Sequence, residues 1–295
     1  MWVSIPSVFL SGGRLAERHV FFVCGAPKSG TTWLQRVLDA HPQIQCSGEG
    51  HFIERFSAPL AKIMRHYSEH RTLVAERVYE GAAYYPPLVQ ADLDRIVRAF
   101  ITEQLMTRKP GPEVQWIGDK TPRYTGSLPA LLRLFPSARF FNILRDPRDV
   151  AMARMHQARR AGVAERVAEG TAERIRFVRE GGEDWLKCVS PVEAFTAQHP
   201  GILHSLKYED MLTDPAGEAS KMFRFLGVRH DDDLVARVVA ETSFEAMSGR
   251  KPGEEHPSAF LRKGVAGDWI GKLEPEALAA IEETCGRLMR AHGYS

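Results

Sequence analysis

Two stretches of the chain join a short apolar run to a helical pattern of apolar positions. Residues 19–24 (HVFFVC) form an apolar run that ends in a glycine loop, and residues 33–38 then place apolar side chains at helical spacing. Residues 139–144 (RFFNIL) lead in the same way into a predicted helix over 149–156, and Pro147 suits the first turn of such a helix. The pattern therefore predicts two strand–loop–helix units.

Further strands and helices follow the same alternation. Strands are predicted at 44–46 and 202–206, and a weaker one at 114–117 runs into the segment GDKTPRY. Two later helices, each preceded by an acidic residue and a proline, are predicted to reach residue 226 and to span 276–291. Because strands that alternate with helices are typical of α/β proteins, we expect a mostly parallel central sheet flanked by helices, with ligands at the carboxyl ends of the strands.

Length favours one domain. The 295 residues, 44% of them hydrophobic, can bury the core of a single large domain, which we expect over 1–295. Within it, about 50–110 is helical with a break at 84–87 (YYPP), which is typical of an insertion that covers a site. About 157–185 carries many Arg and Glu residues at mixed spacing, and this favours a solvated helix pair over a charged substrate-binding lid.

Charge and cysteine content exclude several classes of partner. The 39 Lys and Arg residues nearly balance the 37 Asp and Glu residues, and the net charge of +2 argues against nucleic acid or an anionic membrane as partner. Residues 1–10 lack the basic leader of a signal peptide, and no apolar run reaches the roughly 20 residues of a membrane helix. Four cysteines without metal-type spacing indicate reduced thiols in a cytoplasm: Cys24, Cys46, Cys188 and Cys285.

A glycine loop, GAPKSGTT at 25–32, lies between the first predicted strand and its helix. Its backbone amides and the helix N-terminus form an anion site, so we expect it to hold a phosphate. In the nucleoside triphosphate loop G-x-x-x-x-G-K-[ST] a lysine follows the second glycine, but here Thr31 has that position. The lysine is instead Lys28, which can reach the bridging oxygen of a phosphosulfate. Because a sulfuryl group carries less charge than a terminal phosphoryl group, no metal is expected.

Five segments together resemble the sulfotransferase family that uses 3′-phosphoadenosine 5′-phosphosulfate (PAPS). They are GAPKSGTTW at 25–33, LRDPRDVAM at 144–152, LKYEDML at 206–212, ETSFEAM at 241–247 and FLRKGVAGDW at 260–269. The segments stand in the family order and cover about 20–270. The resemblance implies a P-loop-like sulfotransferase fold and transfer of a sulfuryl group from PAPS to a hydroxyl or amine of an acceptor that the sequence does not identify.

The resemblance also implies where the phosphates of PAPS bind. GAPKSGTTW matches the loop for the 5′-phosphosulfate, and Arg145 matches the arginine for the 3′-phosphate, whose two charges suit a planar guanidinium. Arg262 and Lys263 add two cations beside Gly264, where the missing side chain lets backbone amides approach the same phosphate.

Two aromatic residues are candidates for the adenine site. Trp33 and Phe244 can sandwich a base, an interaction worth roughly 1–3 kcal/mol per base, although core packing explains either residue as well. The expected donor-binding set is Pro27, Lys28, Ser29, Gly30, Thr31, Thr32, Trp33, Arg145, Tyr208, Ser243, Phe244, Arg262, Lys263 and Gly264.

The chain departs from the family pattern at the 3′-phosphate. The family usually places a serine eight residues after the 3′-phosphate arginine, but this chain has Ala153. One hydrogen bond to the phosphate is therefore missing, and Arg154 or a C-terminal cation can replace it. Arg148 and Asp149 are expected to form a surface ion pair or to cap the following helix rather than to bind the donor.

A second departure concerns the general base. The cytosolic branch of the family has Lys-Thr-His, with histidine as base, where this chain has Lys120 followed by a threonine and Pro122. Glu49 matches the base of the tyrosylprotein sulfotransferase branch, and His51 is the rival base. A carboxylate that accepts a proton near neutral pH needs a raised pKa, so burial or a nearby acidic group is expected to raise the pKa of Glu49. Lys120 is expected to steady the transferring group opposite Lys28.

Two other functions remain open, and the acceptor is unspecified. A nucleotide kinase is disfavoured by Thr31, and a non-catalytic nucleotide-binding module is disfavoured by the retained lysines and Glu49. A small-molecule acceptor is expected, because no extended basic stretch suits a long polyanion. Phe52, Tyr84 and Tyr85 hint at an aromatic-lined acceptor pocket, but core packing explains them equally well.

Overall fold

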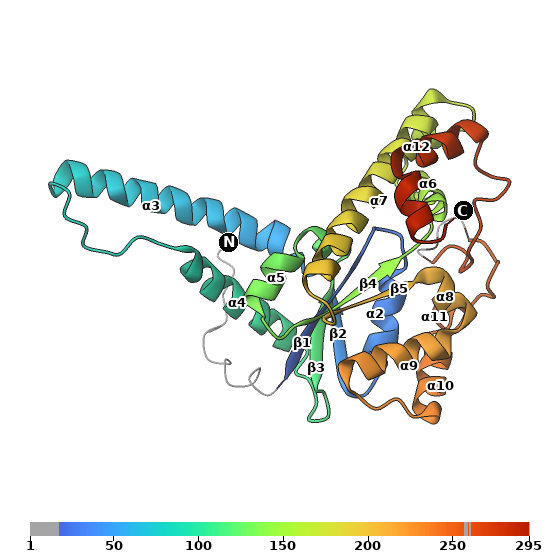
Figure 1. Cartoon of the computed structure of the whole chain (residues 1–295), viewed down its shortest axis with the longest axis horizontal. Coiled ribbons are helices and arrows are strands. Elements are labelled where there is room, and N and C mark those ends of the chain that lie inside the picture. The colour runs from blue at the N-terminus through green and yellow to red at the C-terminus, as the bar shows by residue number, and fades with distance from the viewer. Residues whose placement is uncertain (1–17, 257–258, 260, 295) are drawn as a thin grey trace.

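A computed structural model describes residues 18–256, 259 and 261–294, so residues 1–10, on which the leader-peptide expectation rests, lie outside the described residues. Its centre is a five-stranded sheet in the order β2-β3-β1-β4-β5, and every neighbouring pair is parallel (Figure 1). The strands are β1 (His19–Gly25), β2 (Ile44–Gly48), β3 (Trp116–Lys120), β4 (Arg139–Leu144) and β5 (Leu203–Lys207). The sheet confirms the predicted α/β fold class.

Strand β3 differs most from its prediction. It begins two residues later than expected and continues through Asp119 and Lys120, both of which are buried. A charged pair in a strand is normally read as the strand's end, but here hydrogen bonds satisfy both side chains. Strand β1 lies against β3 so closely that a Cβ on Gly118 would approach the Phe21 carbonyl oxygen to 2.5 Å, which explains the glycine.

Helices cover both faces of the sheet because alternate strand residues bury their side chains on opposite sides. On one face, α2 (Thr31–Asp39), α9 (Pro215–Leu226) and α10 (Asp232–Glu241) pack against residues such as Phe21. On the other face, the packing helices are α4 (Gln90–Met106), α5 (Leu128–Leu134) and α7 (Ala172–Gln198). A third apolar cluster joins α7 to α6 (Pro147–Arg160) and α12 (Pro275–Ala291).

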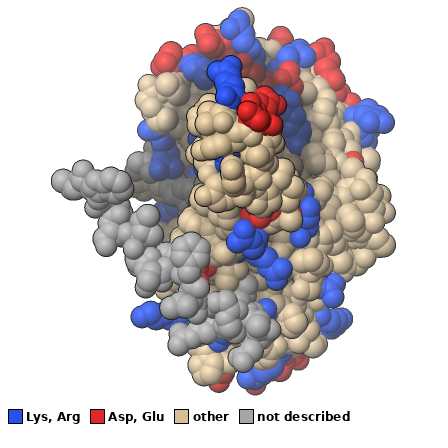
Figure 2. All heavy atoms as spheres, turned by 90° about the vertical axis from the view of Figure 1, so that its left-hand side faces the viewer, with Lys and Arg blue, Asp and Glu red and all other residues tan. Residues whose placement is uncertain are grey.

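Residues 50–110 form a helical arm that leaves the body of the molecule (Figure 1). A π-helical turn, η1 (Phe52–Ser57), continues into α3 (Ala58–Val78), which has no buried residue, and α4 returns to the sheet. In Figure 2 the arm points toward the viewer, and its end consists mostly of residues that are neither acidic nor basic. Phe52 is a core residue, so the core-packing interpretation is confirmed for it, whereas the exposed Tyr84 and Tyr85 lie neither in the core nor on the pocket wall.

The charged segment at 157–185 packs one side on the core and exposes the other to solvent. Helix α6 ends at Arg160, a 3-10 turn η3 (Ala164–Val167) follows, and α7 begins at Ala172. Arg174 is buried in α7 and forms a 3.0 Å ion pair with Glu274, at the start of α12. Phe177 and Asp184 of the same helix line the pocket described below.

Three short helical segments lie near the site, and the four cysteines lie in the core. Helix α8 (Tyr208–Thr213), α11 (Phe244–Ser248) and the 3-10 turn η2 (Pro122–Gly126) lie next to the carboxyl edge of the sheet. All four cysteines are buried and unpaired, as their spacing predicted. Among the described helices, none has the length and apolar character that a membrane span requires.

Candidate active site

One pocket of about 1200 Å³ opens at the carboxyl edge of the sheet. Its wall comes from the loop after β1, the ends of β2 and β4, helices α2, α6, α7, α8, α10 and α11, and residues 261–266. The sequence-predicted residues on this wall are Pro27, Lys28, Gly30, Thr31, Thr32, Trp33, Glu49, His51, Arg145, Tyr208, Ser243, Phe244, Arg262, Lys263 and Gly264. Ser29 and Lys120 are buried beside residues of the wall, so the fold brings the whole predicted set together.

The loop between β1 and α2 has the backbone of an anion site. Its turn is closed by a hydrogen bond from the Ser29 amide to the Ala26 carbonyl at 3.0 Å, and Lys28 and Gly30 both have positive φ. A Cβ on Gly30 would lie 2.6 Å from the Tyr208 ring, so glycine is required there. The Ser29 hydroxyl is buried and has no hydrogen-bond partner among the described residues. The amides, this hydroxyl and the α2 N-terminus therefore suit a phosphate.

Lys28 stands in a cationic environment. Burial lowers the pKa of its ammonium group, and the charges of Arg160 and Arg145 lower it further, against the opposing effect of Glu49. A bound anion would relieve both the desolvation and the repulsion. Binding of a negatively charged ligand beside Lys28 would therefore stabilise this site.

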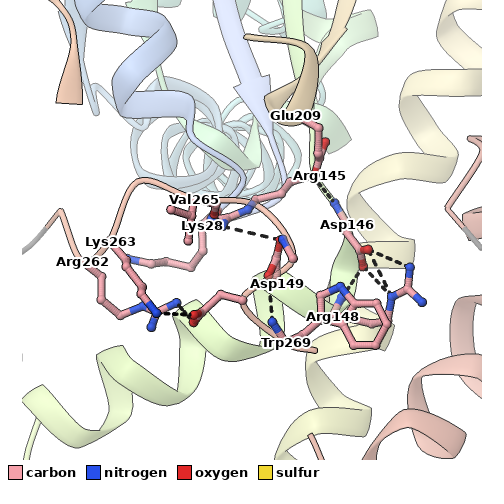
Figure 3. Close-up of polar contacts among 12 residues, drawn as sticks. Lys28, Arg145, Asp146, Arg148, Asp149, Glu209, Arg262, Lys263, Val265 and Trp269 are labelled. Carbon is pink, nitrogen blue, oxygen red and sulfur yellow. Dashed lines mark hydrogen bonds and ion pairs between the residues drawn. The ribbon is translucent and has the colours of Figure 1, made fainter. Parts of the chain in front are cut away.

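Arg145 joins two segments that are far apart in sequence (Figure 3). Its guanidinium donates to the Lys28 carbonyl at 3.3 Å and to the Val265 carbonyl at 3.0 Å, and it lies 4.2 Å from the centre of the Tyr208 ring. Its Nε is buried without a partner in the described structure. One residue therefore fixes the phosphate loop relative to the C-terminal segment and keeps a donor for a further anion.

Asp149 has a different role from the one predicted. It is 1% exposed and accepts hydrogen bonds from the backbone amides of Gly267, at 2.8 Å, and Trp269, at 3.3 Å (Figure 3). Arg148 pairs instead with Asp146, whose side chain caps α6. The prediction of an Arg148–Asp149 surface pair is wrong, because Asp149 fastens the C-terminal segment to α6.

The C-terminal cations share one carboxylate that the sequence reading missed. Asp268 is buried and forms ion pairs with Arg262, with Lys263 at 2.9 Å and with Lys272 at 2.5 Å. Burial alone would raise the pKa of Asp268, but its three cationic partners hold that pKa well below the usual range. Asp268 therefore orients Arg262 and Lys263 toward the pocket wall.

The adenine-side candidates both line the pocket. Trp33 donates from its indole N–H to the Thr242 carbonyl at 3.0 Å and packs against the core, so its core-packing role is confirmed and its stacking on adenine stays a prediction. Phe244 packs so tightly on Gly264 that a Cβ there would come within 2.4 Å of its ring. Ser243 caps α11 by accepting from the Ala246 amide at 3.1 Å.

Glu49 stands at the end of β2, beside the end of β3. Its amide donates to the Lys120 carbonyl at 2.9 Å, and its Oε1 accepts from Lys120 Nζ at 2.6 Å. His51 Nε2 lies 3.4 Å from Glu49 Oε2. Partial burial would raise the pKa of Glu49, but the hydrogen bond and the positive charge of Lys120 outweigh it and leave the pKa below its ordinary value. The prediction of a raised pKa is therefore wrong.

A buried carboxylate under this segment escaped the sequence reading. Asp119 accepts from the Gly50 amide at 3.1 Å and from the hydroxyls of Thr121 and Tyr124, both at 2.9 Å. It holds the backbone next to Glu49 in place. The signal that could have found it is the charged pair that ends the weak strand before Thr121.

The remaining departure concerns the 3′-phosphate serine. Ala153 lines the pocket, as its position predicted. Arg154 forms an ion pair with Asp184 at 2.8 Å, so its charge is directed to α7.

Among the described residues no group of three or more His, Cys, Asp or Glu side chains could hold a metal ion.

A parallel sheet with a phosphate loop and a cationic segment at its carboxyl edge defines a nucleotide-dependent group-transfer fold. A sequence model of the sulfotransferase family matches residues 21–232, and the chain belongs to this family. Two similar curated proteins are a putative protein-tyrosine sulfotransferase of Caenorhabditis briggsae, 26% identical over 74% of this chain and 68% of the relative, and protein-tyrosine sulfotransferase 2 of Gallus gallus, 26% identical over 94% and 70%.

Solved structures show the same fold at low identity. A mouse sulfotransferase complexed with 3′-phosphoadenosine 5′-phosphate (PAP) has a TM-score of 0.57 at 19% identity, covering 93% of this chain and 84% of that one. A sulfotransferase from Mycobacterium avium has a TM-score of 0.54 at 13% identity, covering 95% and 78%. The predicted family, fold and enzyme class are confirmed, and the kinase and non-catalytic interpretations give way to a sulfotransferase.

Proposed function

We propose that the pocket binds PAPS and that the enzyme transfers its sulfuryl group to a hydroxyl or amine of an acceptor. The observation that carries the proposal is the bridge made by Arg145 between the phosphate loop and the Arg262–Lys263 segment. This bridge suits a ligand with phosphate groups at both ends. The buried, unpartnered Ser29 hydroxyl and Arg145 Nε fit additional phosphate oxygens, and the mouse structure complexed with PAP supports the assignment.

The residues at the pocket's centre supply what sulfuryl transfer requires. PAPS brings the sulfuryl group and a phosphate leaving group. Lys28 offers its ammonium to the negative charge that grows on the leaving oxygen, and Glu49 offers a carboxylate to the acceptor's proton. Lys120, which contacts both Glu49 and Thr32, connects the proton acceptor to the phosphate loop.

We expect PAP to bind in the micromolar range whether or not a chelator is present. The phosphate loop, Arg145 and the Arg262–Lys263 pair supply the positive charge, so no metal is needed to neutralise the ligand. Isothermal titration calorimetry of PAP and ATP, with and without a chelator, makes the measurement. Loss of PAP binding in the chelator, or tighter binding of ATP than of PAP, would contradict the proposal.

A matched pair of arginine variants serves as the control for this experiment. Arg145→Ala removes a donor at the carboxyl end of β4 and should weaken PAP more than AMP, which lacks the 3′-phosphate. Arg139→Ala removes an arginine at the opposite end of the same strand, outside the pocket, and should leave both ligands unaffected. Equal weakening of PAP and AMP by Arg145→Ala would remove Arg145 from the 3′-phosphate.

The acceptor that we propose is a small molecule, and the proposed compartment is the cytoplasm. Pro122, Val163 and Phe177 give the rest of the pocket an apolar wall that suits a compact hydrophobic or aromatic acceptor. The four buried, unpaired cysteines suit a reducing compartment. The names of the curated relatives point to protein tyrosine for those proteins, so a peptide is the competing acceptor.

Labelled PAPS distinguishes the acceptor classes. We expect small phenols or alcohols to be sulfated with a higher kcat/KM than a tyrosine-containing peptide, because Pro122, Val163 and Phe177 offer a compact acceptor apolar contacts. Amines and aliphatic alcohols belong in the same screen. A higher kcat/KM for the peptide would overturn the small-molecule proposal and leave the sulfotransferase assignment intact.

A further inference from the structure

His51 lies between two carboxylates, with one ring nitrogen directed to each. Its Nδ1 is 2.5 Å from Glu54 Oε1, and its Nε2 is 3.4 Å from Glu49 Oε2. The other oxygen of Glu49 accepts from Lys120 at 2.6 Å. These contacts form a continuous row of polar side chains: Lys120, Glu49, His51 and Glu54. The row begins behind the pocket wall and includes Glu49, the predicted general base.

The backbone that carries these four side chains adopts a conformation that costs free energy. Glu49 and His51 both have positive φ, at 58° and 48°, a region that non-glycine residues rarely occupy. Asp119 fixes the Gly50 amide between them, and the His51 amide donates to the Thr121 hydroxyl at 3.3 Å. The His51 carbonyl then accepts from Arg55 at 3.0 Å in turn η1, which places Glu54 beside the imidazole.

Glu54 itself does not line the pocket, so it reaches the reaction only through His51. Its second oxygen, Oε2, is buried without a hydrogen-bond partner in the described part of the chain. A carboxylate with one buried and unpartnered oxygen is stabilised by a positive charge that develops beside it. An imidazole that gains a proton supplies that charge.

We propose that Glu54 is a positioning residue that holds the Nδ1–H of His51, so that the Nε2 lone pair faces Glu49 and receives the proton that Glu49 takes from the acceptor. This inference rests on the proposed sulfuryl transfer. The acceptor oxygen forms its bond to sulfur while the sulfur–oxygen bond to the phosphate breaks, with the bonding electrons leaving on the phosphate. The acceptor proton passes to Glu49 Oε2 and then to His51 Nε2.

The transfer of the proton from Glu49 to His51 follows from the relative basicity of a carboxylate and an imidazole. Free imidazole is a stronger base than a free carboxylate by about two pKa units, so a proton on a glutamate moves readily to a neighbouring histidine. Lys120 strengthens this preference, because its ammonium favours the ionised form of Glu49. The resulting imidazolium lies between two carboxylates, and the partly exposed ring can return the proton to solvent.

The test measures kcat, the acceptor KM and the pH profile of kcat for Glu54→Gln, His51→Gln and the double variant. We expect Glu54→Gln to lower kcat by about 10- to 100-fold, below the full 10² to 10⁴ of acid–base catalysis, with an unchanged acceptor KM. The acid limb of the profile should move to lower pH, because the imidazolium loses one of the charged groups around it, leaving Glu49, Asp119 and Lys120. Glu54→Asp, which keeps the carboxylate, should recover most of kcat.

The double variant separates positioning from general loss of structure. If Glu54 acts only through His51, Glu54→Gln combined with His51→Gln should be no slower than His51→Gln alone. Glu193→Gln is the matched control, since Glu193 pairs with His292 at 3.0 Å outside the pocket and its loss should change nothing. PAP binding by each variant shows that the fold is intact.

Two outcomes are decisive and are distinguishable from each other. A wild-type kcat and acid limb in Glu54→Gln, or fully additive losses in the double variant, would overturn the inference while the sulfotransferase assignment stands. If the wild-type chain transfers no sulfuryl group from labelled PAPS to any acceptor tested, the proposed function and this inference both fail.

Discussion

Lys28→Ala should lower kcat by about 10² to 10³ while changing the affinity for PAP far less. The magnitude is that of removing one preorganised donor from a site where charge develops. The Lys28 ammonium is partly buried among other cations, so its interaction strengthens as negative charge grows on the leaving oxygen. Single-turnover transfer from labelled PAPS measures kcat for the chemical step, and calorimetry with PAP measures affinity.

The control for this variant must reproduce its backbone strain. Lys109 is also a lysine with positive φ, at 50°, and it lies outside the pocket. Lys109→Ala imposes the same change on the left-handed backbone without touching the phosphate loop, and it should leave kcat unchanged. An unchanged kcat for Lys28→Ala in an assay limited by chemistry would eliminate its proposed role.

Glu49→Gln should lower kcat by about 10² to 10⁴, the range of general acid–base catalysis. The amide cannot take the acceptor proton, and it leaves the buried Lys120 ammonium without its 2.6 Å carboxylate partner. Because Lys120 keeps the pKa of Glu49 below its ordinary value, the carboxylate stays ionised down to more acidic pH than a free glutamate. Single-turnover transfer, with PAP binding verified for the variant, makes the measurement.

Glu218→Gln provides the comparison, because Glu218 forms an equally close pair with Lys221, at 2.6 Å, outside the pocket. That variant should transfer at the wild-type rate. Glu49→Gln at the wild-type rate together with an inactive His51→Gln would make the histidine the base. Such a result would also remove the proposed order of proton transfer.

The features that the sequence predicted well are contiguous in the chain. Four strands overlap the ranges that were predicted for them, and the phosphate loop is one short segment that contains its glycines and its lysine. Strand β3 was misplaced because Asp119 and Lys120 are charged, and a pattern of hydrophobicity treats charged residues as exposed. Their burial depends on partners that only the folded structure supplies.

The residues that the sequence did not reveal act through contacts between distant segments. Asp149 binds the amide of Gly267, 118 positions away, and no local pattern encodes such a contact. Asp268 follows two predicted cations in the chain, but only the folded segment brings its carboxylate into ion pairs with them and with Lys272. Glu54 lies only three residues after His51 in the sequence, but no local sequence pattern marks the π-helical turn that brings the two side chains together.

The α3 arm divides the molecule into parts that open at different free energies. Its first turns contact the core through Leu60 and Met64, but side chains farther out, including Tyr67 and Val78, remain exposed. Beyond Met64 the arm has few contacts with the core, and most of the stability of a helix in a protein comes from tertiary packing, so the amide hydrogens there are protected by little more than the helix's own hydrogen bonds. Hydrogen exchange in the arm therefore reports local fraying, while exchange in the central strands reports global unfolding. Ligand binding at the carboxyl edge should slow exchange in the central strands and leave exchange in the arm unchanged.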